Sequence, residues 1–255
     1  MKKKGCLLFF AAFVFLMVFS CNVGCEPTNK FEKEPLDQVI KEYSNFSNFS
    51  IILNDMNYDE GDKKYKHQYK VIHEPLEKGK DTLLQKTTDW KIVSELFFKK
   101  HLDNMGMEIA SKKDGVLKKT PAPPGFSNYV GNESYGQWQT NSSGTSFWEF
   151  YGQYAFMSSM FSLLNPVGYS TWGDSRRDYD RGRPYYGSGS NTYGTNSPEN
   201  KSARPNSSWN NKTSDFKSRV RNKVQRSTTT RSSVKRSSSR YNQSRMRSRS
   251  GGFGK

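Results

Sequence analysis

The side chains best suited to catalysis or metal binding are few: three histidines and three cysteines among 255 residues. His67 and His73 fall in one alternating stretch, about 20 Å apart along an extended strand. That separation is too large for one metal ion, and neither His-x-x-x-His nor Cys-x-x-Cys occurs. No Gly-x-Ser-x-Gly elbow and no phosphate-binding Gly-x-x-x-x-Gly-Lys loop occurs either. We therefore expect no metal, no cofactor, no catalytic residue and a non-enzymatic function.

One enzymatic alternative stays open. A hydrolase with paired carboxylates needs two acidic side chains close in space, which need not be close in sequence. The neighbours Asp59 and Glu60 lie in a predicted turn, where solvated side chains are the simpler interpretation.

Cysteine chemistry is expected at Cys21. Three lysines precede a 14-residue apolar run, Cys6–Phe19, which is shorter than the ~20 residues of a membrane-spanning helix and typical of a signal peptide. The run ends in Val18-Phe19-Ser20-Cys21, which resembles the lipobox of bacterial lipoproteins. The resemblance implies a signal peptide over 1–20, acyl chains on Cys21 and a lipidated linker over 21–32. It places the protein in the bacterial cell envelope, with inner or outer membrane left open and Asn22 favouring the outer.

Charge is concentrated toward the C-terminus. Of the net charge of +16, residues 171–255 contribute +15, from 20 basic and 5 acidic side chains. Leu, Ile, Val and Phe are only 5 of those 85 residues, well under the ~20% that a chain needs to build a core. We therefore predict a disordered Arg/Ser-rich tail over 166–255.

The basic side chains of this tail are the expected contacts for a polyanion. Near an anionic surface each contributes about 1 kcal/mol. Behind an export signal the partners would be anionic lipid, lipopolysaccharide or a wall polymer. A nucleic-acid-binding protein is the alternative, because arginine and interleaved tyrosine also suit phosphates and bases. The predicted contacts are Arg219, Arg221, Arg226, Arg231, Lys235, Arg236, Arg240, Arg245, Arg247 and Arg249.

The elements that must position these features are clearest over 33–120. Leu36, Val39, Ile40 and Tyr43 follow Pro35 at helical spacing. The pattern predicts a small α+β domain over 33–120, then a Pro/Gly/Asn-rich linker over 121–145. Strands are predicted at 50–58, 65–73 and 82–90, a helix at 93–102 with Asp89 as its cap, and a closing hairpin at 107–117.

Residues 146–165 are the most aromatic segment, and they predict a weakly amphipathic helix with Glu149, Gly152 and Gln153 as a polar patch. Three placements are open: in the bilayer interface, packed on the α+β domain, or across the membrane. In the interfacial placement, the residues expected to contact lipid are Phe147, Trp148, Phe150, Tyr151, Tyr154, Phe156 and Phe161.

Three sequence features together support a family resemblance: the lipobox, the Ser142–Trp148 stretch (SSGTSFW) and the C-terminal Gly-Gly-Phe-Gly of 251–254. They resemble an uncharacterised family of bacterial lipoproteins with a signal, an SSGxSFW-type aromatic helix and a Ser/Arg-rich tail. The resemblance carries no activity with it. We expect an exported, lipid-anchored envelope protein of binding or structural type, whose α+β domain contacts an unknown protein partner.

Overall fold

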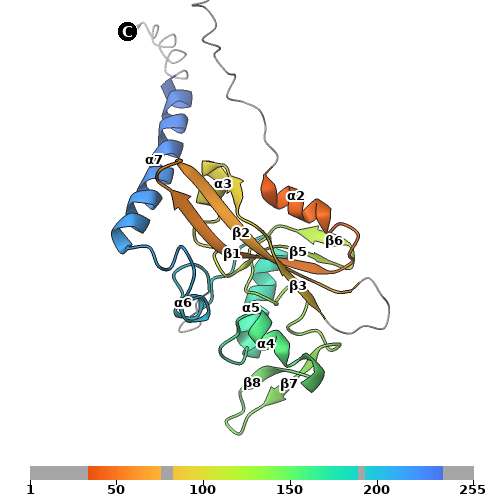
Figure 1. Ribbon diagram of the computed structural model, residues 1–255. Coiled ribbons are helices and arrows are strands. Elements are labelled where there is room, and N and C mark those ends of the chain that lie inside the picture. The colour runs from red at the N-terminus through yellow and green to blue at the C-terminus, as the bar shows by residue number, and fades with distance from the viewer. Residues whose placement is uncertain (1–33, 76–82, 189–192, 238–255) are drawn as a thin grey trace, which may run out of the picture. The chain divides into compact units, whose positions relative to one another are not determined.

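The computed structural model describes residues 34–75, 83–188 and 193–237 (Figure 1). These residues belong to one compact unit that begins at Glu34. The unit contains an antiparallel six-stranded sheet in the order β3-β2-β1-β5-β6, with β4 also paired to β2. The predicted α+β class is confirmed. The strands are β1 (Phe49–Asp59), β2 (Lys64–His73), β3 (Leu84–Thr87), β4 (Lys91–Val93), β5 (Glu108–Lys113) and β6 (Val116–Lys118).

The β1–β2 hairpin, which the alternating pattern predicts, divides the core into two. Successive side chains on a strand point to opposite faces, so Ile51 contributes to one hydrophobic cluster and Ile52 to the other. A bulge between Leu53 and Asp55 interrupts the register with β2. Beyond this bulge the carboxylate of Asp55 is buried, with only 6% of the residue exposed.

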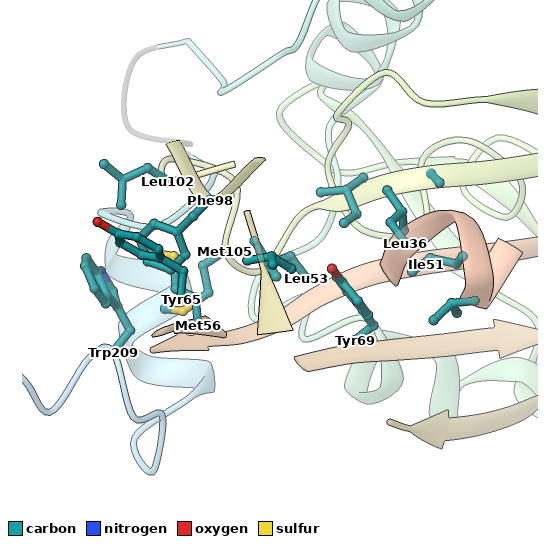
Figure 2. Packing of buried hydrophobic residues seen from close by; sticks show 14 of the residues in the cluster. Leu36, Ile51, Leu53, Met56, Tyr65, Tyr69, Phe98, Leu102, Met105 and Trp209 are labelled. Carbon is teal, nitrogen blue, oxygen red and sulfur yellow. The ribbon is translucent and has the colours of Figure 1, made fainter. Parts of the chain in front are cut away.

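The first core lies between the sheet and the helices α2 (Pro35–Glu42), α3 (Glu95–Lys100) and α7 (Ser214–Ser237). Figure 2 shows part of this cluster, including Trp209, far along the chain from the strands it packs against. The sequence places the cap of α3 wrongly at Asp89. Ser94 is the cap, since its Oγ accepts a hydrogen bond from Phe97 N at 3.1 Å.

The second core covers the opposite face and includes the segment predicted as a linker. Phe126, Tyr129 and Val130 are buried in it, and Asn128 donates to the backbone oxygens of Phe49 and Lys112. The linker prediction for 121–145 is therefore wrong. Proline and glycine shape this segment into turns, and its aromatic side chains pack against Ile52 and Ile72 of the sheet.

The aromatic segment 146–165 is not one helix. It forms β8 (Ser146–Phe150), a 3-10 turn at Gly152–Tyr154 and the short α4 (Phe156–Met160). β8 pairs with β7 (Gly136–Thr140), which brings Trp138 opposite Trp148. Trp148 and Phe150 are buried and alternate with exposed Glu149, so the period at the start of the segment is that of a strand.

The described part of the predicted tail is ordered into helices. These are α5 (Tyr169–Asp180), α6 (Pro198–Ala203) and α7. Phe216, Val220 and Val224 of α7 lie four residues apart, so they share one helix face, and all three are buried in the first core. A segment with few apolar residues builds no core alone, but here those few complete a core that the sheet begins. The predicted disorder is wrong for these residues, while 238–255 lie outside the described residues.

Candidate functional site at Arg204

A cavity of about 40 Å³ lies between the 161–166 segment, the 193–204 segment and Gly106. Its charged lining residues are Glu199 and Arg204, and Ser162, Asn165 and Ser197 add polar groups. Counting ~10–15 Å³ for each water, the space holds about three waters. It therefore suits a small polar ligand.

The helix α6 positions both charged residues. Ser197 caps it, because its Oγ accepts from Asn200 N at 3.0 Å, and Pro198 occupies the first turn. Glu199 lies in the same first turn, and Arg204 ends the helix. The short helix thus carries an acid in its first turn and an arginine at its C-terminal end, and both residues line one cavity.

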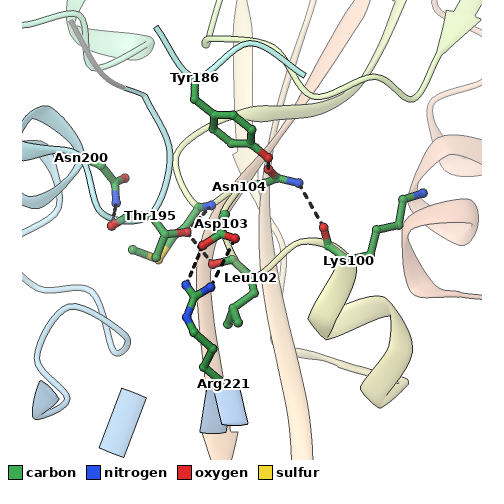
Figure 3. A network of polar contacts seen from close by, with 9 residues as sticks. Lys100, Leu102, Asp103, Asn104, Tyr186, Thr195, Asn200 and Arg221 are labelled. Atoms are coloured by element: carbon green, nitrogen blue, oxygen red, sulfur yellow. Dashed lines mark hydrogen bonds and ion pairs between the residues drawn. The ribbon is translucent and has the colours of Figure 1, made fainter. Parts of the chain in front are cut away.

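Hydrogen bonds to the 102–105 loop hold this region against the sheet domain (Figure 3). Thr195 Oγ1 donates to Leu102 O at 2.7 Å and accepts from Met105 N at 3.0 Å. Asn200 Nδ2 donates to Thr195 O at 3.3 Å. Gly106 permits the close approach, because a Cβ there would lie 2.3 Å from Asn200 Oδ1. The cavity wall is therefore fixed by contacts between segments about 90 residues apart in sequence.

The guanidinium of Arg204 is only partly satisfied. Its Nη1 donates to Asn200 Oδ1 at 3.0 Å, while Nε and Nη2 are buried and have no hydrogen-bond partner. Burial lowers the pKa of this side chain. The two unpaired donors form the side-on fork that binds both oxygens of a carboxylate.

Asp55 acts on Arg204 electrostatically but does not pair with it. Burial lowers the Arg204 pKa, and Asp55 partly offsets that shift. The Asp55 carboxylate is occupied by Ser207 Oγ at 2.7 Å, Ser208 N at 2.6 Å and Trp209 N at 3.2 Å. Its oxygens are committed to the turn that leads into α7, so Asp55 does not satisfy the buried Nε and Nη2 donors of Arg204.

A second cation raises the positive potential near the fork. Lys70 of β2 is partly buried and donates to Met160 O at 3.4 Å. Its pKa is lowered by burial and then by the positive charge of Arg204. The lowered pKa of Lys70 reflects the positive potential that Arg204 produces at that position, and a positive potential favours a bound negative charge.

The opposite charge in the cavity is also unsatisfied. Glu199 Oε2 is buried and has no hydrogen-bond partner. Among the described ion pairs, none joins Glu199 to Arg204. Two residues of opposite charge that line this cavity therefore each carry buried polar atoms without a hydrogen-bond partner.

Two of the three histidines lie close together away from this cavity, which the sequence does not reveal. His67 lies near His101, with ring centroids 6.3 Å apart, and not near His73. Burial lowers the pKa of both, to about 3 for His101, so both are neutral. Within the described ranges, no three His, Cys, Asp or Glu side chains are grouped to hold a metal ion. These imidazoles belong to the first core.

The predicted lipid contacts divide into two groups. Trp148, Phe150, Tyr154 and Phe161 are buried in the second core, so they are not available to a bilayer in this fold. Phe147 is half-buried, and Tyr151 and Phe156 are exposed. The helical spacing assumed for these seven side chains is absent, because the segment starts as a strand. In the described part of the chain no helix has both the length and the apolar character to cross a membrane.

The predicted polyanion contacts are partly engaged within the fold. Arg219 lies 3.5 Å from Glu60, and Arg221 lies 2.6 Å from Asp103. Arg226 lies on α7, and the backbone of α7 continues through Arg231, Lys235 and Arg236. Arg240, Arg245, Arg247 and Arg249 lie outside the described residues, as do the signal segment and Cys21.

Arg204 and Glu199 are not among the functional residues that the sequence predicts. The available signal is Ser197-Pro198-Glu199, which is typical of a helix start, with Arg204 four residues after Asn200. Nothing in that pattern shows that the guanidinium is buried.

Three comparisons with known proteins add nothing to the geometry: no family model, no curated protein and no solved structure matches the chain.

Proposed function

We propose that this chain is an exported, lipid-anchored protein of the bacterial cell envelope that binds a small carboxylate ligand without catalysis. The unit from Glu34 onward is the binding module, and the Arg204 cavity is its site. The observation that carries the proposal is the Arg204 fork, two buried N–H donors with no hydrogen-bond partner on a residue that lines a cavity.

The energetics favour an occupied fork. Each buried donor without a partner costs about 1–3 kcal/mol, and a hydrogen bond between charged groups contributes about 1.5–3 kcal/mol. A carboxylate that reaches Nε and Nη2 satisfies both donors and compensates the buried charge. Among the described residues that line the cavity, no hydrogen bond pairs Ser162 or Ser197 with Glu199 as a base, so binding is the activity that fits the site.

The anchor and the tail extend the proposal to the membrane. Acyl chains on Cys21 would hold the module at the bilayer, since each buried methylene contributes ~0.8 kcal/mol. The basic residues after Arg226 would contact anionic lipid, lipopolysaccharide or wall polymer nearby, at about 1 kcal/mol each.

The binding proposal is tested by NMR on the full-length chain in detergent, with ¹⁵N-labelled arginine and acetate as the probe. Acetate has four heavy atoms, which bounds its affinity to the ~0.1 mM range or weaker. We expect the Arg204 Nε–H resonance, assigned by its loss in Arg204→Gln, to shift as acetate is added. Arg183→Gln is the matched control, because Arg183 is exposed and pairs with Asp178 at 2.9 Å.

Two results oppose the binding proposal. One is an Arg204 resonance that stays fixed up to about 100 mM acetate; the other is a response of equal size at exposed arginines. Sodium chloride at the same ionic strength separates specific binding from a general salt effect.

Anchoring is tested by cell fractionation. We expect Cys21→Ala to move the protein from the membrane to the soluble fraction and to remove the lipid mass from the mature N-terminus. Cys25→Ala is the control and should stay in the membrane. A Cys21→Ala protein that remains fully membrane-bound contradicts the lipid anchor.

A further inference from the structure

An apolar side chain is exposed at the start of α3. Leu96 lies in the first turn of this helix, and 60% of the residue is exposed. Beside it is a depression of about 440 Å³, which Leu96 and Phe97 line together with Lys99, Lys100 and Glu34. Apolar and cationic side chains in one place are typical of a surface that meets a lipid bilayer, because hydrocarbon takes up the apolar groups and lipid phosphates attract the lysines.

This surface lies where the chain enters the unit. Ser94, the N-cap of α3, donates from its Oγ to Glu34 Oε1 at 2.5 Å, and Glu34 is the first residue of the unit. Only 12 residues separate Glu34 from Cys21, and a chain of that length reaches at most about 45 Å. Acyl chains on Cys21 would therefore keep the α3 surface close to a bilayer.

The helix α7 brings positive charge to the same end of the unit. It packs against α3, and Val224 of α7 shares the first core with Phe98 of α3. From Lys223 to Ser237, α7 contains five basic residues and no acidic one. Figure 1 shows α3 and this half of α7 at the same end of the unit. A group of cations next to exposed apolar side chains strengthens attraction to an anionic surface.

The opposite face of the sheet also exposes apolar side chains, but it lacks this charge. Leu164 is 54% exposed and lies beside Trp148 and Phe150 of the second core. Residues 120–175, which supply most of that core, contain three acidic residues and no Lys or Arg. Charge therefore distinguishes the two exposed apolar regions, and it favours α3 for contact with an anionic surface.

We propose that α3 and the C-terminal half of α7 form a membrane-docking face, on which Leu96 enters an anionic bilayer while the positive charge of Lys100 and of α7 is held near the lipid phosphates. This inference rests on the proposed lipid anchor and adds which face of the unit meets the membrane. Docking in this way leaves Leu164, on the other face of the sheet, in water.

The test follows a fluorescent label at position 96 in the full-length lipidated chain. In a Cys25→Ala background, Leu96→Cys is labelled with the environment-sensitive dye NBD. The protein is reconstituted in vesicles of phosphatidylethanolamine and anionic phosphatidylglycerol in equal amounts, or of neutral phosphatidylcholine. We expect stronger and blue-shifted emission in the anionic vesicles. Leu164→Cys is the matched control, because Leu164 is similarly exposed, and its emission should be the same in both kinds of vesicle.

Charge variants test the attraction to lipid phosphates. With the label at position 96, Lys100→Gln should lower the ratio of docked to undocked protein by about fivefold, the factor for one cation near an anionic surface. Arg177→Gln, on α5, removes the same charge at an exposed arginine and should change that ratio by less than about twofold. Thermal unfolding of each variant establishes that it is folded, so a lost signal is not a lost fold.

The outcomes separate this inference from the anchor, because flotation of the protein with vesicles reports anchoring alone. If the protein floats but position 96 responds no more than position 164, the docking face is wrong and the anchor stands. A response at position 96 in detergent that grows with protein concentration indicates contact between two copies of the chain, and it also contradicts docking. If the protein does not float and Cys21 carries no lipid, both are wrong.

Discussion

Two kinds of buried charge lie within this unit, and they differ in how far their hydrogen bonds are satisfied. Asp55 and Glu108 are saturated: Asp55 accepts from the 207–209 turn, and Glu108 accepts from Gly125 N at 2.7 Å and from Ser127 Oγ. Arg204 and Glu199 are not, since three of their buried atoms have no partner.

We propose that this difference separates charges with a structural role from charges that bind a ligand. The saturated carboxylates each join a segment of irregular backbone to the sheet, Asp55 the turn before α7 and Glu108 the 121–130 segment. A saturated group has nothing left to offer a ligand. Arg204 and Glu199 keep buried polar atoms without partners and line a cavity, which is the combination that the proposed binding role requires.

The largest expected effect is at Asp55. Asp55→Ala should lower the free energy of unfolding by about 3–5 kcal/mol, because it leaves Ser207, Ser208 and Trp209 groups buried without an acceptor. Chemical denaturation measures the loss. Asp62→Ala, at an exposed acid, should change stability by less than about 0.5 kcal/mol. If the two variants lose similar amounts, Asp55 does not anchor the α7 segment.

Glu108 provides a pH-dependent effect of intermediate size. Burial raises its pKa to about 7 from an ordinary 4.5, against the hydrogen bonds from Ser127 and Gly125 that lower it. The folded state therefore holds this proton more tightly than the unfolded state, and the group's contribution to stability decreases as pH rises from about 4.5 through 7. Above pH 7 the full cost, about 3 kcal/mol, is present.

The Glu108 effect is measured as a difference between variants. His67 and His101 act in the opposite direction, because their lowered pKa values make stability fall as pH decreases below about 6.5. We expect Glu108→Gln to match the wild type at pH 4.5 and to gain on it by up to about 3 kcal/mol at pH 8. A gap between the two proteins that is the same at both pH values contradicts the raised pKa.

The smallest expected effect is a gain in stability from a change at Arg204, opposite in sign to the loss expected for Asp55→Ala. Arg204→Met keeps the length of the side chain and removes a buried charge with two unpaired donors, so we expect it to raise the ligand-free unfolding free energy by about 1 kcal/mol. Arg183→Met, on the surface, should stay within about 0.5 kcal/mol of the wild type. A clear destabilisation by Arg204→Met would show that Arg204 stabilises the fold as Asp55 and Glu108 do, and the two kinds of buried charge would then not differ in role.

Sequence periodicity predicts most of the helices and strands between Pro35 and Lys118. The β1–β2 hairpin, α2, α3 and the β5–β6 hairpin follow from alternation and helical spacing, because each buries a regular face. Periodicity does not predict the structure of 146–160, because a segment with so many aromatic residues fits both the helical repeat and the strand repeat. The start of this segment is a strand because β8 pairs with β7, with Trp138 opposite Trp148.

The C-terminal segment shows the limit of composition. Its shortage of apolar residues correctly indicates that it has no core of its own, but Trp209, Phe216 and Val220 are buried against strands more than 140 residues earlier. A count taken along the segment does not include the surface that the rest of the chain provides.

By itself, the sequence determines the α+β class, the location of the basic charge and the absence of familiar catalytic or metal-binding motifs, since these depend on local spacing and composition. Only the tertiary structure decides which charges are buried and which are satisfied. Asp55 and Arg204 are both ordinary charged residues in the sequence. Their difference arises because the 207–209 turn occupies the Asp55 carboxylate, through contacts between residues about 150 positions apart, while two donors of Arg204 have no partner.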